Sequence, residues 1–213
     1  LVLLQKKLYR VNMIFDLHVH TTHSPCSKLR LEEIISLART RGLDGVAITD
    51  HNSMECCREI TEGLQDNGVC LLVGMEYDTP EGDFLLFGSF EDLKPGLSAR
   101  DLLSIVTDRQ GVAVSAHPCR AGRSLKPKIL SLGVCRIIEG LNGRNSDEEN
   151  RNVEQLRRQY PLFQCGGSDA HTLEELGRTA TCFEEKITSR EELIAALKKG
   201  HYRPVRGKIG SHF

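Results

Sequence analysis

The sequence predicts an α/β fold in which parallel strands form a distorted, TIM-like barrel with helices on the outside. Three observations support this prediction. Short apolar runs alternate with amphipathic stretches along most of the chain. Most connections between the apolar runs are long enough to contain a helix. The length of 213 residues fits one domain with a substantial core. We therefore expect a single barrel domain over residues 1–213.

The strand-like runs are short and apolar, and most are separated by amphipathic segments. They cover residues 14–18, 45–49, 69–75, 84–88, 112–116, 135–139, 162–166 and 179–183. The run at 84–88 follows the run at 69–75 too closely for a helix, so we expect a hairpin-like insertion there. The other runs follow a βαβα order, which requires a parallel sheet covered by helices.

Helices are predicted between several of these runs. Residues 31–38 place apolar side chains at helical spacing, and Gly42 follows as a C-cap glycine. Residues 98–111 repeat this design. Residues 189–192 form a capping box that opens a helix ending at Gly200.

Composition and charge exclude several classes of protein. Hydrophobic residues make up 39% and charged residues 27% of the chain, which is typical of a soluble folded protein. A net charge of -1 argues against a surface built for stable nucleic-acid binding. No long apolar run predicts a membrane span, and the apolar start does not have the pattern of a signal peptide. Residues 1–12 are interpreted as an N-terminal extension or a short edge segment.

The eight cysteines favour a reducing compartment. Four of them, Cys70, Cys135, Cys165 and Cys182, lie in apolar runs, where they are expected to be small buried hydrophobic residues. There is no C-x-x-C pair of the kind that holds structural zinc. We therefore expect a cytoplasmic protein.

Residues that bind metals follow five of the predicted strands. They are His18 and His20, His51, Glu76, His117, and Asp169 with His171. In a parallel barrel the carboxyl ends of the strands meet at one rim, where active sites form. The sequence therefore predicts that these side chains converge.

The spacing of these residues supports a metal site. Side chains alternate along a strand, so the imidazoles of His18 and His20 point the same way, and Asp169 and His171 have the same spacing. Imidazoles and carboxylates together suit Zn²⁺, Mn²⁺ or Fe²⁺. A carboxylate such as Glu76 would bridge two ions. A pair of ions about 3.5–4 Å apart would activate a hydroxide for in-line attack at phosphorus.

In this combination and order the motifs resemble the PHP family, named for polymerase and histidinol phosphatase. The resemblance covers residues 13–183 and depends on the segments DLHVHT (16–21), ITDH (48–51), GME (74–76), AHP (116–118) and GSDAH (167–171). It implies a distorted (β/α)7 barrel with two or three divalent metal ions at the carboxyl ends of the strands.

The resemblance also implies ligands for the first two ions. His18, His20, Glu76 and Asp169 would surround the first ion, and Glu76 would bridge to a second ion bound by His117. The family commonly adds a histidine from the hairpin that follows the glutamate strand. In this sequence that position corresponds to Asp83.

For a third ion the resemblance implies His51 and His171. The family places an Asp or His shortly after the His-x-His motif, whereas this chain has Ser24-Pro25-Cys26. We expect Cys26 to take this position as a thiolate, which would favour zinc.

Cations near the rim are candidates for binding a phosphate. Arg120, Arg123 and Lys126 follow His117, and Arg144 follows the next strand. An arginine can hold a phosphate through two hydrogen bonds.

The expected reaction is hydrolysis of a phosphate mono- or diester by metal-bound hydroxide, with Asp169 or His171 relaying protons. Expected substrates are a nucleotide, a sugar phosphate or an oligonucleotide end. One alternative is an amide or ester hydrolase of the amidohydrolase type, but no lysine follows a central strand to serve as a carboxylated ligand. The other alternative is a metal-binding regulatory domain without catalysis. Oligomeric state is not predicted.

Overall fold

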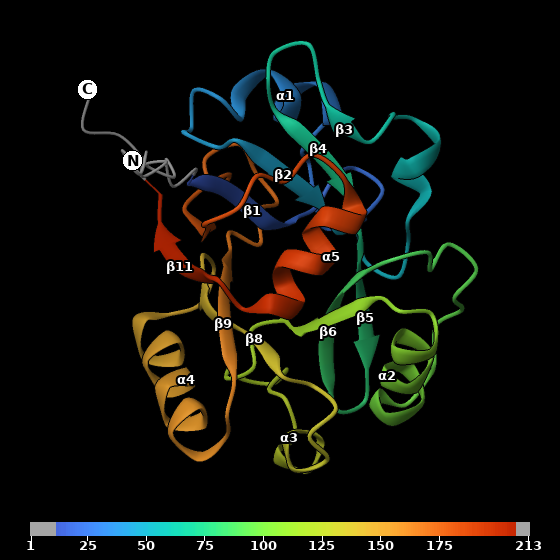
Figure 1. Cartoon of the computed structure of the whole chain (residues 1–213), viewed down its shortest axis with the longest axis vertical. Coiled ribbons are helices and arrows are strands. Elements are labelled where there is room, and N and C mark those ends of the chain that lie inside the picture. Colours follow the sequence, from blue (N-terminus) through green and yellow to red (C-terminus); the bar gives the residue numbers. More distant parts are fainter. Residues whose placement is uncertain (1–11, 208–213) are drawn as a thin grey trace, which may run out of the picture.

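The computed structural model describes residues 12–207, and Figure 1 shows how the elements are arranged. The strands are β1 (Met13–Val19), β2 (Gly45–Ile48), β3 (Gly63–Leu64), β4 (Cys70–Val73), β5 (Met75–Thr79), β6 (Gly82–Phe87), β7 (Val112–Ser115), β8 (Ile137–Asn142), β9 (Phe163–Gly167), β10 (Thr179–Phe183) and β11 (Tyr202–Arg206). The helices are α1 (Leu31–Leu37), α2 (Ala99–Asp108), α3 (Pro127–Ser131), α4 (Asp147–Gln159) and α5 (Arg190–Lys199), with a 3-10 turn at Glu55–Arg58. The possible N-terminal extension lies almost wholly outside the described residues.

The strands form two sheets. One has the order β11-β10-β1-β2-β4-β3, and the other has the order β5-β6-β7-β8-β9. The predicted α/β class is confirmed, but the strands of the predicted distorted barrel form two separate sheets and not one closed ring. The physical reason lies at Gly74, which separates β4 from β5, so that one predicted strand contributes to both sheets.

The predicted hairpin is confirmed, because β5 and β6 pair in the antiparallel sense across a tight turn, but it is part of the sheet and not an insertion beside it. β6 pairs with β5 on one side and with β7 on the other, both in the antiparallel sense, so it is a central strand of its sheet. Sequence spacing revealed the tight turn between β5 and β6, but not the partner on the far side. β10 is antiparallel to its neighbours β1 and β11 as well.

The two sheets meet where the metal-binding motifs lie. Isolated parallel bridges join Val19 to Ala170 and His51 to Glu76. The backbone N–H of His20 donates to the carbonyl of Ala170 at 2.9 Å, which extends the first of these contacts. The carboxyl ends of β1 and β2 thus lie beside the carboxyl end of β9 and the amino end of β5, although the sheets do not share a continuous hydrogen-bond ladder.

Both faces of the central strands are buried, as expected for sheets with parallel strands. One set of strand side chains, including Phe15, Leu72 and Phe87, packs against Leu193 and Leu197 of α5. Figure 1 shows α5 crossing the front of the molecule between the two sheets. The opposite set packs against apolar residues of α1, α2, α3 and α4.

The predicted helices form with small differences in their ends. α5 follows Ser189, whose side chain accepts from the N–H of Glu192, and it ends at Gly200 in the left-handed conformation with φ of 80°. α1 ends earlier than predicted, with Ala38 as its C-cap, and Gly42 (φ 77°) belongs to the turn that follows. No helix within residues 12–207 is both long and apolar enough to cross a membrane.

Candidate metal centre

The predicted ligands converge where the carboxyl ends of β1, β2, β7 and β9 meet the amino end of β5. His18 lies in β1, His20 directly follows it, and His51 lies in the loop after β2. Glu76 lies at the start of β5, His117 follows β7, and Asp169 and His171 follow β9. Six of these side chains are buried, and that of His51 is 24% exposed.

The first group joins His18, His20, Glu76 and Asp169. The Nε2 atoms of the two histidines lie 3.0 Å apart. Glu76 Oε2 lies 3.3 Å from the first Nε2 and 3.2 Å from the second. Asp169 Oδ1 lies 3.6 and 3.4 Å from the same two atoms. Two imidazole nitrogens and two carboxylate oxygens therefore face one small volume.

The second group extends from the other oxygen of Glu76. His117 Nε2 lies 2.8 Å from Glu76 Oε1, and His18 completes a potential metal-binding set. Asp83 Oδ2 is more distant, at 3.9 Å from His117 Nε2. Arg123 Nε donates to that same Asp83 oxygen at 2.6 Å. Asp83 is thus close to the site, but in this arrangement it pairs with an arginine.

The third group consists of His20, His51 and His171. Cys26, which the sequence predicts in this position, is exposed, and its Sγ lies 3.1 Å from His171 Nε2. It does not belong to the three-residue set found among the described residues. The sequence predicts His20 as a ligand of the first ion only, whereas in the structure it also belongs to this third group.

The donor set fits divalent metal ions. Nδ1 of His51 and Nδ1 of His117 are buried and make no hydrogen bond, although Nδ1 of His51 lies 3.2 Å from Glu76 Oε2. Buried polar atoms without partners are rare in folded proteins, and they often mark a missing ion or water. Imidazole nitrogens with carboxylate oxygens favour zinc, manganese or iron.

Two of the predicted ligands occupy unusual backbone conformations. His117 has φ of 29° and Asp169 has φ of 57°, and neither is a glycine. Such conformations cost on the order of 1–3 kcal/mol and occur most often at functional sites. The fold thus holds these two side chains in the site at a cost in stability.

Sequence reasoning did not identify Glu139 as part of this site. Its side chain in β8 is fully buried. Oε1 lies 2.9 Å from Nδ1 of His18, and Oε2 accepts from the backbone N–H of His117 at 2.8 Å and from Asn142 Nδ2 at 2.8 Å. A hydrogen on Nδ1 of His18 leaves Nε2 free to face the other ligands. The signal in the sequence was a glutamate near the end of a predicted strand.

Asp16 and Asp50 stabilise the loops of the site. Asp16 accepts from the backbone N–H groups of Ser168 and Gly177, at 2.8 and 3.0 Å, and from no imidazole. Burial raises the pKa of Asp16 to about 6, although these N–H groups lower it. Asp50 accepts from Ser24 Oγ at 2.6 Å, and Ser24 Oγ lies 3.3 Å from Nδ1 of His20.

All three predicted arginines reach the site. Arg120 Nη2 lies 2.7 Å from Asp169 Oδ2, and Arg144 Nη1 lies 3.3 Å from Nε2 of His171. Arg123 binds Asp83 as described above. The side chains of Arg120, Arg123 and Arg144 are 20%, 48% and 41% exposed, so each is accessible from solvent.

The charged groups of the site shift one another's pKa values. Burial lowers the pKa of His18, but Glu139, Asp169 and Glu76 outweigh burial and raise it well above its usual value. The pKa of Glu76 falls well below its usual range, because His18 and His117 outweigh the effect of burial. Burial and the charge of His20 lower the pKa of His171 to about 4, so this imidazole is neutral at neutral pH.

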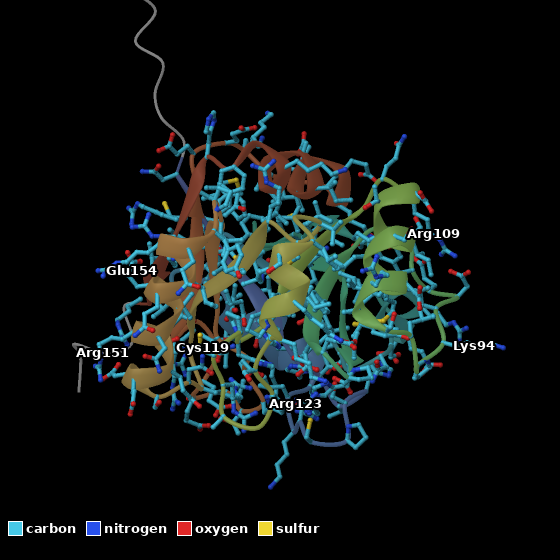
Figure 2. The ribbon with its side chains drawn as sticks, turned by 90° about the horizontal axis from the view of Figure 1, so that it is seen from below. Lys94, Arg109, Cys119, Arg123, Arg151 and Glu154 are labelled. Atoms are coloured by element: carbon cyan, nitrogen blue, oxygen red, sulfur yellow. The ribbon has the colours of Figure 1, made fainter. Side chains whose placement is uncertain are left out.

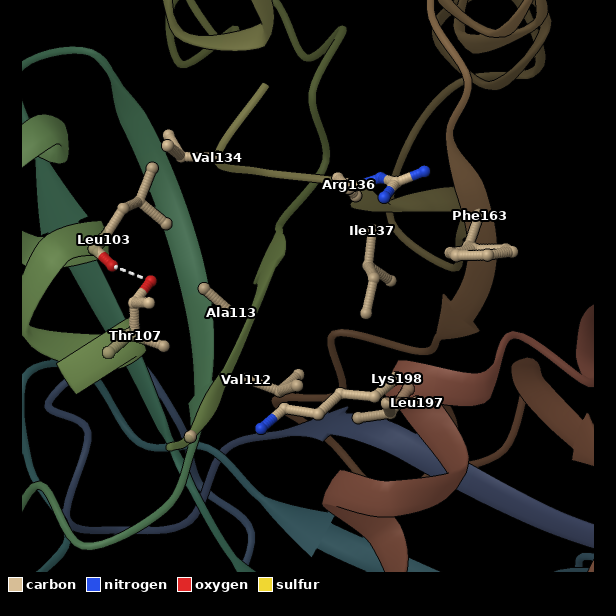
Figure 3. Close-up of a pocket in the computed structure, with 12 residues that line it drawn as sticks. Leu103, Thr107, Val112, Ala113, Val134, Arg136, Ile137, Phe163, Leu197 and Lys198 are labelled. Atoms are coloured by element: carbon tan, nitrogen blue, oxygen red, sulfur yellow. Dashed lines mark hydrogen bonds between the residues drawn. The ribbon is translucent and has the colours of Figure 1, made fainter. Parts of the chain in front are cut away.

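A separate apolar cavity lies at the opposite ends of the strands. Its volume is about 210 Å³, and Figure 3 shows Val112, Ile137 and Phe163, from the amino-terminal ends of β7, β8 and β9, in its walls. The candidate metal centre lies at the carboxyl ends of β7 and β9, so this cavity does not belong to it.

Comparison with known proteins supports the resemblance to the PHP family. Residues 147–202 match the family model described as PHP-associated. An uncharacterized protein of Methanocaldococcus jannaschii, MJ1587, is 32% identical over 113 residues. That alignment covers 48% of this chain and 66% of the relative, just under two-thirds of the relative's length.

Several solved structures have a similar fold at low sequence identity. PsfC from Pseudomonas syringae has a TM-score of 0.73 and 18% identity, and the match covers 92% of this chain and 91% of that one. An inferred metal-dependent phosphoesterase from Bifidobacterium adolescentis has a TM-score of 0.64 and 19% identity, with 87% and 96% covered. The lesion-specific endonuclease PfuEndoQ from Pyrococcus furiosus has a TM-score of 0.69 and 20% identity, with 92% and 58% covered. The predicted PHP resemblance is thus confirmed at the level of the fold and of the matched family segment.

Proposed function

We propose that this protein is a metal-dependent hydrolase of phosphate esters, and that its site is the cluster of His18, His20, His51, Glu76, His117, Asp169 and His171. The observation that carries the proposal is the overlap of three potential metal-binding sets, since His18 belongs to two of them and His20 belongs to two. Similar folds include a lesion-specific endonuclease and an inferred metal-dependent phosphoesterase, which agrees with this class of reaction.

The proposed ligands divide among two or three divalent ions, Zn²⁺, Mn²⁺ or Fe²⁺. His18, His20, Glu76 and Asp169 would hold one ion, and Glu76 with His117 would hold a second. His51, His171 and His20 would hold a third, with Cys26 close by. When bound, such ions neutralise charge on phosphate oxygens and lower the pKa of water.

The residues of the chain would orient the phosphate and move a proton. Arg120 and Arg144 lie against Asp169 and His171, so a phosphate at the cluster would meet two guanidinium groups. Nδ1 of His171 lies 2.9 Å from the carbonyl oxygen of Asp169, which only accepts, and 3.0 Å from Nη1 of Arg144, which only donates. In this proposal Nδ1 carries the hydrogen and donates it to the carbonyl, and a bound phosphate takes Arg144 as its partner. Nε2 then keeps a lone pair, which binds an ion or accepts a proton from water.

The remaining parts of the proposal concern the whole protein. In this proposal the chain is one domain, and the two sheets within residues 12–207 correspond to an opened, distorted (β/α)7 barrel. The substrate is a phosphorylated small molecule or nucleotide. The likeness to a DNA endonuclease adds nucleic-acid ends as a candidate and weakens the expectation that nucleic acid does not bind. A cytoplasmic location stays a prediction from the cysteines, all of which are free thiols.

The amidohydrolase alternative is less well supported by the site. No lysine directly follows a central strand in the sequence, where the carboxylated ligand of that class would be expected. The regulatory alternative predicts metal binding without turnover, and the experiment below distinguishes it.

The test combines metal analysis with hydrolysis of p-nitrophenyl phosphate and bis-p-nitrophenyl phosphate. We expect bound Zn, Mn or Fe, and turnover that falls at least ~100-fold in Glu76→Gln, because that glutamate contacts both proposed ion positions. Glu154→Ala is the matched control, since Glu154 pairs with Arg157 on the surface of α4. Metal binding without turnover of either ester would favour the regulatory alternative, and absence of both would refute the proposal.

A further inference from the structure

A polar pocket opens beside the candidate metal centre. Its volume is about 470 Å³, within the range of small-molecule sites. It lies between the β5–β6 hairpin and the loop that follows β7. Figure 2 shows Arg123 projecting from this loop at the edge of the molecule. Asp78, Asp83 and Arg123 form the wall that the pocket shares with the cluster. A phosphate ester bound at the cluster would therefore direct its alcohol group here.

The lining of the pocket is chemically distinctive. It consists of Asp78, Thr79, Pro80, Gly82, Asp83, Gly122, Arg123, Ser124 and Lys126. This set offers carboxylates, hydroxyls and cations, but no aromatic ring and no long aliphatic side chain. A nucleobase or an aryl group normally binds against aromatic or aliphatic surfaces, which are missing from this lining.

The charges of the pocket are nearly balanced. Arg123 donates from Nη2 to Asp78 Oδ1 at 2.8 Å, in addition to its bond with Asp83. Asp78 also accepts from Nδ2 of Asn52 at 2.9 Å. Lys126 adds a cation that has no ion pair or hydrogen bond from its ammonium group within residues 12–207. Two carboxylates and two cations favour a neutral guest that both donates and accepts hydrogen bonds.

The walls of the pocket are fixed by close backbone contacts. The backbone N–H of Lys126 donates to the carbonyl of Glu81 at 2.8 Å, which ties the loop to the hairpin. Gly82 has φ of 133°, and a Cβ there would lie 3.0 Å from Cα of Leu125. Only glycine tolerates both conditions easily, so the hairpin and the loop approach each other closely. A preformed wall lowers the entropic cost of binding a small polar group.

We propose that this pocket binds the hydroxyl-rich alcohol portion of the substrate, so that the preferred ester is the phosphate of a sugar or another polyol. This inference rests on the proposed function of the adjacent cluster. The carboxylates of Asp78 and Asp83 accept from sugar hydroxyls, and Lys126 and Ser124 donate to them. Hydrolysis would then add water at phosphorus, break the ester P–O bond and release the polyol, whose oxygen takes up the proton.

The first test compares catalytic selectivity. The ratio of kcat/KM for a hexose phosphate to that for p-nitrophenyl phosphate is measured for the wild type, Lys126→Met and Ser124→Val. We expect the ratio to fall about 5- to 30-fold in each variant, because each variant loses one hydrogen bond to a hydroxyl of the sugar. Lys128→Met is the matched control, because Lys128 pairs with Glu81 and does not line the pocket. An unchanged ratio in both pocket variants would refute the inference.

The second test does not depend on turnover. Unphosphorylated glucose is titrated into the full-length protein, and backbone amide NMR shifts are followed. Shifts at Lys126, Ser124 and Thr79 that the Lys126→Met variant weakens would support the pocket even if no ester is hydrolysed. Hydrolysis of p-nitrophenyl phosphate without these shifts and without hexose selectivity would leave the proposed function standing and overturn the inference. Selectivity for bisphosphorylated esters alone would assign the pocket to a second phosphate and also overturn it.

Discussion

At the scale of single residues, Glu139 connects two histidines that come from different sheets. It contacts the ring of His18 and the backbone of His117, and it is fully buried. Substitution to alanine would leave buried N–H groups without acceptors, at a cost of about 1–3 kcal/mol for each group. We expect Glu139→Ala to weaken divalent metal binding about 10- to 100-fold, measured by calorimetric titration of the metal-free protein.

Two comparisons separate this positioning role from general destabilisation. Glu139→Gln retains one acceptor and should retain more of the affinity than Glu139→Ala. The urea dependence of unfolding, measured on the same samples, shows whether Glu139→Ala is folded during the titration. If the folded alanine variant binds metal as tightly as the wild type, Glu139 does not position the ligands.

The titration of His18 predicts how the stability of the metal-free protein depends on pH. Its pKa in the folded protein lies well above the usual 6.5, despite burial, because of Glu139, Asp169 and Glu76. A raised folded pKa gives stability that is complete below the unfolded pKa and is lost as pH rises through the folded pKa. In EDTA we therefore expect the free energy of unfolding to decline above neutral pH.

Bound divalent metal should weaken the pH dependence of the free energy of unfolding, because the ions take the place of the proton on His18. Urea unfolding from about pH 6 to about pH 9, with EDTA and with excess Mn²⁺, tests the prediction. A decline of the same size in both conditions would contradict it.

The sequence predicted most of the residues of the candidate site, because they lie at or just beyond the ends of recognisable strands. The positions of His18, His20, Glu76 and Asp169 match the expected convergence. The structure departs from the prediction where a side chain from outside the strand ends pairs with a predicted metal ligand. Arg123 reaches Asp83 from a loop after a different strand, and no local pattern predicts that pairing.

At the scale of elements, Gly74 explains why one predicted strand became two. The run at 69–75 is continuous in hydrophobicity, yet β4 and β5 belong to different sheets. At Gly74 the backbone passes so close to β6 that a Cβ would lie 2.5 Å from the carbonyl oxygen of Leu86. Hydrophobic pattern reports burial, but it does not report which partner a strand pairs with. The sequence did not predict β3, β11 or α3, because these elements are short or have no clear hydrophobic pattern.

We expect Gly74→Ala to destabilise the protein by on the order of 3 kcal/mol, because the close approach to Leu86 must open. Gly68→Ala is the control. Gly68 has φ of 80°, but a Cβ there would have no atom within 4 Å, so only backbone strain of about 1–2 kcal/mol is expected. Chemical denaturation compares the two. A smaller loss of stability for Gly74→Ala than for Gly68→Ala would show that the contact between Gly74 and Leu86 accommodates a methyl group.

At the scale of the whole molecule, the site spans the seam between the two sheets. His18, His20 and His51 come from the first sheet, whereas Glu76 and Asp169 come from the second. Bound ions would therefore join the sheets directly. At 100 times the dissociation constant, a ligand that binds only the folded state adds about 2.7 kcal/mol, which raises Tm by ~5–10 °C for a chain of this size.

Thermal unfolding with and without Zn²⁺ or Mn²⁺ measures this effect. Glu76→Gln should lose most of the increase, and Glu154→Ala should retain it. Hydrogen exchange should slow at the amides of His20 and Glu76, where backbone bonds cross between the sheets. A metal-induced rise in Tm that persists in Glu76→Gln would place the bound ion elsewhere.

The order of the strands along the chain has a consequence for biosynthesis. The second sheet, from β5 to β9, is one uninterrupted segment inserted between the two parts of the first sheet. As the chain leaves the ribosome, this inner sheet is complete in sequence while β1 still lacks its partner β10, since Met13 pairs with Phe183. Domains commonly begin to fold during synthesis, and distant pairings form slowly. The edge of β1 that binds β10 therefore stays unpaired during synthesis until the whole second sheet has been made.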